Sequence, residues 1–330
     1  MRAGPAPVKP PERLRGRRRL RVPGSRLTCN PEPDNPMPEL PDIVAYIEAL
    51  ERKTVGQTIV DIRVKSPFVI RSFDPPISAA IGQRVTGIRR IGKRIAWDLE
   101  GDLYLVIHLM IAGRFLWKSR GAPMTNKIAL VAFDFDSGTL ILTEAGTQKR
   151  ASIHLVRGAE GLKEFDRGGM EVLEVPIERF SERLRSENHT LKRSLTDPRL
   201  FSGIGNAYSD EILHRARLSP ILLTSKITDE QIAALFDATK QVLVEWTNRF
   251  RELYRDGFPE KVTAFRPEMA VHGKFGEPCP VCGTPVQRIR YASNETNYCA
   301  RCQTGGKLLA DRALSRLLKQ DWPKSIDEVV

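Results

Sequence analysis

Four of the five cysteines stand close together near the end of the chain, in two Cys-x-x-Cys pairs. Cys279 and Cys282 form the first pair, and Cys299 and Cys302 form the second after sixteen intervening residues. Tetrahedral zinc accepts four thiolates, and this spacing lies in the range of such sites. The pattern predicts one structural Zn²⁺ that replaces a hydrophobic core in a small module. A catalytic zinc is not expected, because four thiolates leave no coordination position open. His272 is not expected to be a ligand, since the four cysteines already complete the site.

The charge of the chain indicates a polyanionic partner. The formal net charge is +12 and the pI is about 9.6. Lys and Arg gain free energy by displacing counterions from phosphates, so nucleic acid is the leading candidate. The longest apolar run, Leu103–Ala112, is interrupted by His108 and is shorter than the ~20 residues that span a bilayer. Membrane insertion is therefore not expected.

Residues 1–36 differ in composition from the rest of the chain. They hold nine Lys and Arg and three acidic residues, a net +6, together with many prolines and Cys29. Such a segment lacks the hydrophobic period of a folded element, and we expect a disordered leader. An Arg-rich transit peptide and a true start at Met37 are two alternative interpretations. Because the other cysteines cluster at one place, we expect metal binding in a reducing compartment, not disulfides.

The hydrophobic pattern changes three times along the chain. Helical spacing over 42–51 is followed by short β-rich segments between residues 58 and 155, which favour an antiparallel sandwich or barrel. These segments are Thr58–Val64, Arg84–Ile91, Arg94–Leu99, Tyr104–Leu109, Lys127–Asp134, Thr139–Leu142 and Ser152–Leu155. Helices are then expected at Ile177–Leu184, Asp210–Ala216 and Asp229–Phe250. The Cys-bearing module follows at 271–302, and one more helix is expected at Leu308–Leu318.

A glycine-rich turn lies between apolar helical segments. Gly203 and Gly205 stand two apart and precede Asn206. Glycine lets a backbone approach a phosphate closely, and a following helix N-terminus adds its dipole. A Gly-x-Gly alone is a weak signal, and an ordinary helix–helix turn explains it equally well.

The segment Met37-Pro-Glu-Leu-Pro-Asp42, taken together with this turn and the cysteine pairs, resembles the formamidopyrimidine-DNA glycosylase / endonuclease VIII family. The resemblance runs from Met37 to about Gln303. It implies an α+β multidomain fold: an N-terminal β-sandwich with an N-terminal helix, a helical helix-two-turn-helix domain, and a C-terminal β-hairpin zinc finger. The implied domains are 37–165, 166–268 and 269–303, followed by a tail over 304–330.

The resemblance also implies roles for particular residues. Pro38 would be the nucleophile, because a terminal amine has a lower pKa than lysine and is partly neutral at pH 7. Glu39 resembles the acid that protonates the sugar ring oxygen. Lys93 and Asn206 resemble the groups that hold the lesion phosphate, and Lys192 would assist them. Gly203 and Gly205 belong to the same DNA-binding turn.

This chemistry requires a free nitrogen at Pro38, which residues 1–37 lock into a tertiary amide in the sequence as written. We expect translation to begin at Met37, with cleavage of the leader as one alternative and an inactive chain as another.

The chain departs from the family pattern where the lesion is handled. Ile111 stands where the family often has Met, and Gln148, Lys149 or Arg150 stand in a loop that lacks the family's Asp-Pro-Arg-Arg-Phe-Gly. Asn294 replaces an expected arginine, and Asp42 replaces a common glutamate. We expect Ile111 and Arg150 to fill the gap left by a flipped nucleotide. The preferred lesion and opposite base stay open.

These features together predict a base-excision-repair DNA glycosylase with AP lyase activity on damaged double-stranded DNA. We expect a monomer located in the cytoplasm at the nucleoid. A non-catalytic protein that binds damaged or structured DNA is the alternative, and a general zinc-ribbon module would leave Pro38 and Glu39 unexplained.

Overall fold

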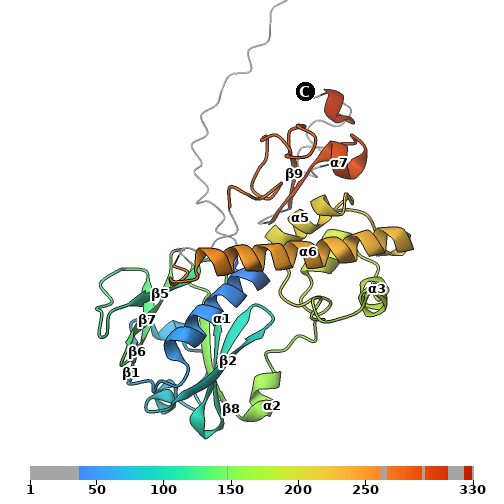
Figure 1. Ribbon diagram of the computed structural model, residues 1–330. Helices are drawn as coiled ribbons and strands as arrows, with labels where there is room; N and C mark the ends of the chain where they lie inside the picture. The colour runs from blue at the N-terminus through green and yellow to red at the C-terminus, as the bar shows by residue number, and fades with distance from the viewer. Residues whose placement is uncertain are drawn as a thin grey trace, which may run out of the picture. The chain divides into compact units, whose positions relative to one another are not determined.

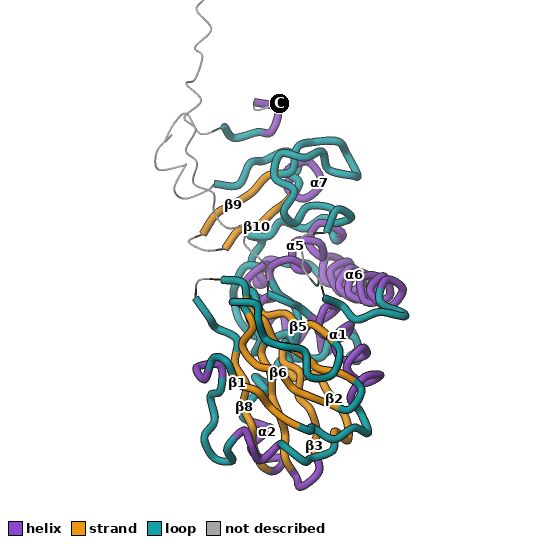
Figure 2. Tube along the Cα trace, turned by 90° about the vertical axis from the view of Figure 1, so that its left-hand side faces the viewer, coloured by secondary structure: helices purple, strands orange, loops and turns teal. Residues whose placement is uncertain are grey.

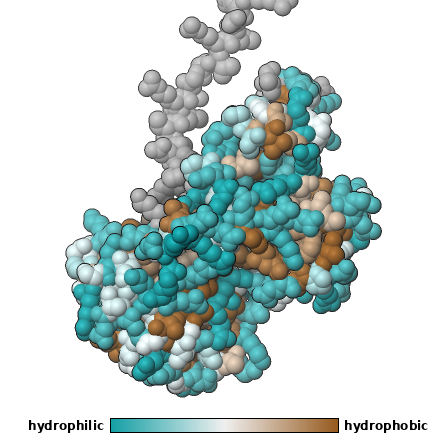
Figure 3. All heavy atoms as spheres, viewed as in Figure 1, coloured by the Kyte–Doolittle hydropathy of each residue, from teal (hydrophilic) through white to brown (hydrophobic). Residues whose placement is uncertain are grey.

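The computed structural model describes residues 37–146, 148–260, 262, 266–291, 294–310 and 323–328. The leader lies outside these residues, as does most of the helix expected at Leu308–Leu318, whose first three residues are not helical. Within the described part of the chain, no helix has both the length and the apolar character needed to cross a bilayer. On the face shown in Figure 3, apolar side chains form separate patches among hydrophilic ones.

The N-terminal region is a sandwich of two four-stranded antiparallel sheets (Figures 1 and 2). One sheet has the order β1 (Asp61–Val64), β6 (Ala129–Phe135), β7 (Gly138–Glu144) and β5 (Gly113–Lys118). The other has the order β2 (Val85–Ile91), β3 (Arg94–Leu99), β4 (Leu103–His108) and β8 (Ser152–Arg157). Large apolar side chains such as Trp97, Phe115 and Phe133 fill the space between the sheets. The sandwich is confirmed, while β5 was not among the expected strands.

Helix α1 (Leu40–Thr54) joins this sandwich to the helical domain. Its Ile43, Tyr46 and Leu50 belong to the sandwich core, whereas Leu40 and Ala45 belong to the core of the helical domain. An apolar helix that is buried on both sides needs partners on both sides. Helix α1 therefore fixes the position of the two domains with respect to each other.

The helical domain packs around one long helix. It contains α3 (Ile177–Arg185), α4 (Leu191–Thr196), α5 (Asn206–Arg215) and α6 (Asp229–Leu253), after the short α2 (Gly158–Lys163) that follows β8. Helix α6 begins with a capping box, in which Thr228 and Gln231 satisfy each other's backbone N–H groups. Short 3₁₀ turns occur at Pro67–Val69, Ile77–Ala80, Glu100–Asp102, Thr224–Lys226 and Ile326–Glu328.

The last module is a β-hairpin, β9 (Gln287–Tyr291) and β10 (Asn294–Tyr298), followed by α7 (Ala300–Thr304). Its apolar clusters are small: one contains Val271 and Val286 with two cysteines, and the other joins Ile289 to residues after α7. This confirms the expected hairpin, and the small clusters agree with the expectation that the module needs a metal ion for stability.

Candidate active site and metal centre

The junction of α1 and α5 holds the buried carboxylate of Glu39. Its oxygens accept backbone N–H groups from Gly205 at 2.6 Å, Ala207 at 2.8 Å and Tyr208 at 3.2 Å. These donors form the first turn of α5, where free N–H groups and the helix dipole favour an anion. Glu39 thus ties the start of α1 to the start of α5, although 166 residues separate it from Gly205.

The two glycines of the turn are required by protein packing at this junction. Gly203 has φ +79°, a conformation that L side chains rarely adopt, and a Cβ there would lie 2.8 Å from Cβ of Leu40. A Cβ on Gly205 would lie 2.5 Å from Oε1 of Glu39 and would collide with Nζ of Lys93. In this structure the two glycines make room for α1 and Lys93, and the expected approach of a phosphate to this turn stays a prediction.

Lys93 lies in the turn between β2 and β3, and its ammonium is directed to Gly205 and Glu39. Burial lowers the pKa of Lys93, and the nearby carboxylates of Glu39 and Asp42 oppose that shift. The side chain therefore reaches the same junction as Glu39 and is not a fully solvated hairpin lysine.

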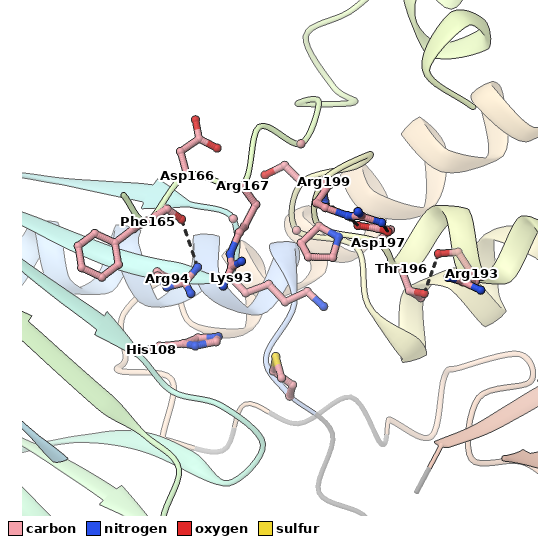
Figure 4. A pocket seen from close by; sticks show the side chains of 16 residues that line it. Lys93, Arg94, His108, Phe165, Asp166, Arg167, Arg193, Thr196, Asp197 and Arg199 are labelled. Carbon is pink, nitrogen blue, oxygen red and sulfur yellow. Dashed lines mark hydrogen bonds and ion pairs between the residues drawn. The ribbon is translucent and has the colours of Figure 1, made fainter. Parts of the chain in front are cut away.

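A cavity of about 610 Å³ opens beside Lys93, between the sandwich and the helical domain. Its lining includes Met37, Gly92, Lys93, Arg94, His108, Phe165, Asp166, Arg167, Gly169, Arg193, Thr196, Asp197, Pro198, Arg199, Ser202 and Gly203. Figure 4 shows Lys93 between Arg94, His108 and Phe165 on one side and Thr196, Asp197 and Arg199 on the other. Basic side chains outnumber acidic ones on these walls, so the cavity favours an anionic ligand.

Pro38 is buried, and the residue before it, Met37, lines this cavity. The peptide bond to Met37 therefore places the nitrogen of Pro38 close to the cavity wall. His108 also lines the cavity, and burial together with the charges of Arg94 and Lys93 lowers its pKa to about 3. The imidazole is neutral at physiological pH and offers a hydrogen bond without a charge.

Asp42 supports Glu39 from the next turn of α1. Its Oδ2 accepts the backbone N–H of Glu39 at 2.9 Å, whereas its Oδ1 is buried without a hydrogen-bond partner among the described residues. Burial raises the pKa of Asp42 to about 7, although the bond from Glu39 opposes the shift. This carboxyl is a buried titratable group within the candidate active site.

The two loops expected to fill the DNA gap lie next to each other. Ile111 is 39% exposed in the turn between β4 and β5. The backbone N–H of Ala145, in the loop that carries Arg150, donates to the carbonyl of Ala112 at 3.4 Å. Glu144 accepts the backbone N–H of Arg150 at 2.8 Å and so anchors that loop. The structure brings the two loops together, and the role of Ile111 and Arg150 on DNA stays a prediction.

Asn206 contacts the C-terminal hairpin, and Lys192 contacts α5. The amide of Asn206 donates to the carbonyl of Glu295 at 2.8 Å. The ammonium of Lys192 donates to the carbonyl of Asn206 and to Oδ1 of Asp210, both at 2.5 Å. Asp210 also accepts from Nδ1 of His272 at 2.8 Å, so His272 belongs to this buried network. The phosphate contacts expected for Asn206 and Lys192 stay predictions.

The four cysteines converge on one point. The Sγ atoms of Cys279, Cys282, Cys299 and Cys302 all lie within 4.8 Å of one another. The Sγ–Sγ distance is 3.9 Å between Cys279 and Cys302 and 3.4 Å between Cys282 and Cys299. Tetrahedral zinc with Zn–S bonds of about 2.3 Å would place the sulfurs about 3.8 Å apart. The cluster therefore fits a structural metal ion, and thiolates are ligands that zinc prefers.

Sequence reasoning missed several polar residues on α5. Glu211 accepts the backbone N–H groups of Ala270, Val271 and His272, and Nε2 of His214 lies 3.3 Å from Sγ of Cys279. The only signal in the sequence is the spacing of Asn206, Asp210 and His214, which places them on one face of a helix. Their partners are remote along the chain and could not be inferred from that spacing.

The geometry defines a multidomain protein with a basic cavity between a β-sandwich and a helix-two-turn-helix domain, followed by a Cys₄ finger. Three family models match it: the formamidopyrimidine-DNA glycosylase N-terminal domain over 37–148, the H2TH domain of the same enzyme over 171–249, and the zinc finger found in FPG and IleRS over 276–305.

Curated relatives and solved structures agree with these matches. The formamidopyrimidine-DNA glycosylases of Desulfitobacterium hafniense and Solibacter usitatus are 32% and 30% identical, over 81% of this chain and 100% and 99% of theirs. Lactococcus lactis Fpg in complex with a DNA that contains N7-benzyl-Fapy-dG aligns with a TM-score of 0.73 at 28% identity, over 81% of this chain and 100% of that chain. The same protein with an abasic-site DNA gives a TM-score of 0.72 at 27% identity, over 81% and 99%. The chain belongs to the formamidopyrimidine-DNA glycosylase family.

Proposed function

We propose that this protein is a base-excision-repair DNA glycosylase with AP lyase activity, and that it works in the cytoplasm as a monomer on nucleoid DNA. The observation that carries the proposal is the convergence of Glu39 and Lys93 at Gly205, beside a basic cavity that Met37 lines. The Lactococcus lactis Fpg structures contain damaged or abasic DNA, which supports DNA as the partner of this family member.

In the proposed reaction the active chain begins at Pro38. Its neutral secondary amine attacks C1′ of the damaged nucleotide, the glycosidic bond breaks, and the leaving base takes a proton from water. Glu39 takes up the proton that the amine of Pro38 releases and passes it to the sugar ring oxygen as the ring opens, so the intermediate is an iminium ion between Pro38 and the open sugar. The iminium acidifies the adjacent C–H bond, and loss of that proton expels the 3′ phosphate, followed by the 5′ phosphate.

The remaining residues bind and orient the DNA. Lys93 would hold the lesion phosphate next to Pro38, because its ammonium already lies at the junction. Ile111 and Arg150 would enter the gap left by the flipped nucleotide, since their loops are adjacent. Cys279, Cys282, Cys299 and Cys302 would hold a structural Zn²⁺ that keeps the hairpin folded.

The decisive test is borohydride trapping on abasic-site DNA. A protein that begins at Pro38 should form a covalent adduct after reduction of the iminium, whereas the full chain of 330 residues should not. Mass spectrometry of the adduct should place the bond at the terminal nitrogen. Tight binding by the Pro38-started protein without an adduct would instead support a non-catalytic damaged-DNA binding protein.

A further inference from the structure

One face of α5 contacts the finger at three successive helical turns. Asn206 donates to the carbonyl of Glu295, Asp210 pairs with His272, and His214 lies against Cys279. A spacing of four residues keeps these side chains on the same face. The last contact differs from the others because its partner belongs to the cysteine cluster.

The His214–Cys279 contact has the geometry of a hydrogen bond to sulfur. Nε2 of His214 lies 3.3 Å from Sγ of Cys279, and both side chains are buried, with exposed fractions of 6% and 2%. A metal-bound cysteine is a thiolate and can only accept a hydrogen bond. The hydrogen must therefore sit on Nε2, which makes the imidazole the donor.

We propose that His214 is a positioning residue of the metal centre, which donates a hydrogen bond from α5 to the metal-bound thiolate of Cys279. Partners of this kind orient a ligand and reduce the charge on its donor atom, and they retain the metal. Because α5 also presents its first N–H groups to Glu39, one helix contacts both the candidate active site and the metal centre. The proposal depends on metal occupancy and not on the glycosylase reaction.

The contact also explains how the finger is retained on the helical domain. Asn206 and Asp210 contact the hairpin and the segment before it, whereas His214 contacts a metal ligand directly. Loss of the metal should release Cys279 from His214 and so weaken the last of the three contacts. Substitution of His214, which removes the same contact from the side of α5, should weaken retention of the metal.

The test compares two substitutions of His214 in the full chain. His214→Phe keeps an aromatic ring and removes the N–H donor. In His214→Gln, the side-chain amide N–H can take the place of the imidazole N–H as the donor to Cys279. Arg215→Gln is the matched control, because Arg215 pairs with Glu245 and not with the cluster. Zinc release to an excess of chelator and the absorption spectrum of the Co²⁺-substituted protein are measured for each variant.

We expect His214→Phe to accelerate zinc release by about 10-fold to 100-fold. Its thiolate-to-cobalt charge-transfer band should move to longer wavelength, because a sulfur without the hydrogen bond gives up an electron more easily. His214→Gln should restore most of both properties, and Arg215→Gln should match the unmodified protein. Equal release rates and spectra for His214→Phe and the unmodified protein would overturn the proposal, as would a His214→Gln variant as defective as His214→Phe.

A measurement on the unmodified protein keeps the proposal testable if His214→Phe does not fold. Nitrogen-15 chemical shifts of the zinc-loaded chain report which ring nitrogen of His214 carries the hydrogen. Hydrogen on Nε2, protected from exchange with water, supports the proposal. Hydrogen on Nδ1 alone would refute it, because a bare Nε2 cannot donate to Cys279.

Discussion

The α1–α5 junction and the Cys₄ finger both connect parts of the chain that are far apart in sequence, but they are held by different forces. At the junction, a buried carboxylate accepts three backbone N–H groups, and glycines let the elements pack closely. In the finger, four sulfurs surround one point and the apolar clusters are small. The first region should therefore respond to changes in volume and pH, and the second to loss of the metal.

Metal removal should separate the two regions most strongly. A structural zinc contributes on the order of 10 kcal/mol to the folding of a small finger. Chelation, or Cys299→Ser, should abolish protection from hydrogen exchange over 276–305 while β3, β4 and α1 stay protected. Hydrogen-exchange mass spectrometry measures both segments in one experiment. If the finger kept its protection after complete metal removal, its stability would not depend on the metal, and the proposed difference between the two regions would be wrong.

Gly205→Ala should have the largest effect on the junction. The new Cβ would lie 2.5 Å from Oε1 of Glu39, so the carboxylate and Lys93 must both move. Overpacking of this kind costs about 1–3 kcal/mol, and the three N–H bonds to Glu39 should weaken as well. Urea denaturation measures the loss of unfolding free energy. Gly257→Ala is the matched control, because a Cβ there meets no described residue within 4 Å. Equal stability of the two variants would show that the junction tolerates the added volume.

Asp42→Asn should reveal how the titration of the Asp42 carboxyl changes the free energy of unfolding with pH. The folded-state pKa of Asp42 is raised to about 7 by burial, so the fold favours the protonated carboxyl. Stability is therefore present at low pH and is lost as the pH rises from about 4 towards 7. Between pH 5 and pH 8 this group should remove roughly 2–3 kcal/mol of unfolding free energy. Asparagine does not titrate, and the variant should lose less stability over that interval; parallel curves for both proteins would contradict the assignment.

Lys93→Ala should leave stability nearly unchanged and affect DNA binding. Burial lowers the pKa of Lys93, so the fold disfavours its charged form and loss of that charge should not destabilise the protein, whereas the proposed phosphate contact requires the charged form. The variant should bind DNA more weakly. The slope of the logarithm of the binding constant against the logarithm of the salt concentration should become shallower by about one. In the unmodified protein this contribution should disappear as the pH rises through the lowered pKa of Lys93. Binding isotherms at several salt concentrations measure the slope, and an unaltered slope would mean that Lys93 touches no phosphate.

The sequence determined the features that depend on local spacing or on the chemistry of single residues. The two Cys-x-x-Cys pairs predicted a Cys₄ cluster, and alternating apolar residues predicted most strands of the sandwich. The segment around Pro38, taken together with the glycine-rich turn and the cysteine pairs, indicated the family. Strand β5 was missed, since Gly113–Lys118 has no clear alternation between buried and exposed positions.

Only the tertiary structure decided which of these features meet. Glu39 faces Gly205, Lys93 reaches the same point, and His214 touches Cys279, although 166 positions separate the first pair and 65 the last. Each partner on its own has several ordinary explanations, such as a helix cap, a hairpin lysine or a buried histidine. Long-range packing selects one of them, because a buried polar group must find a partner wherever the fold supplies one.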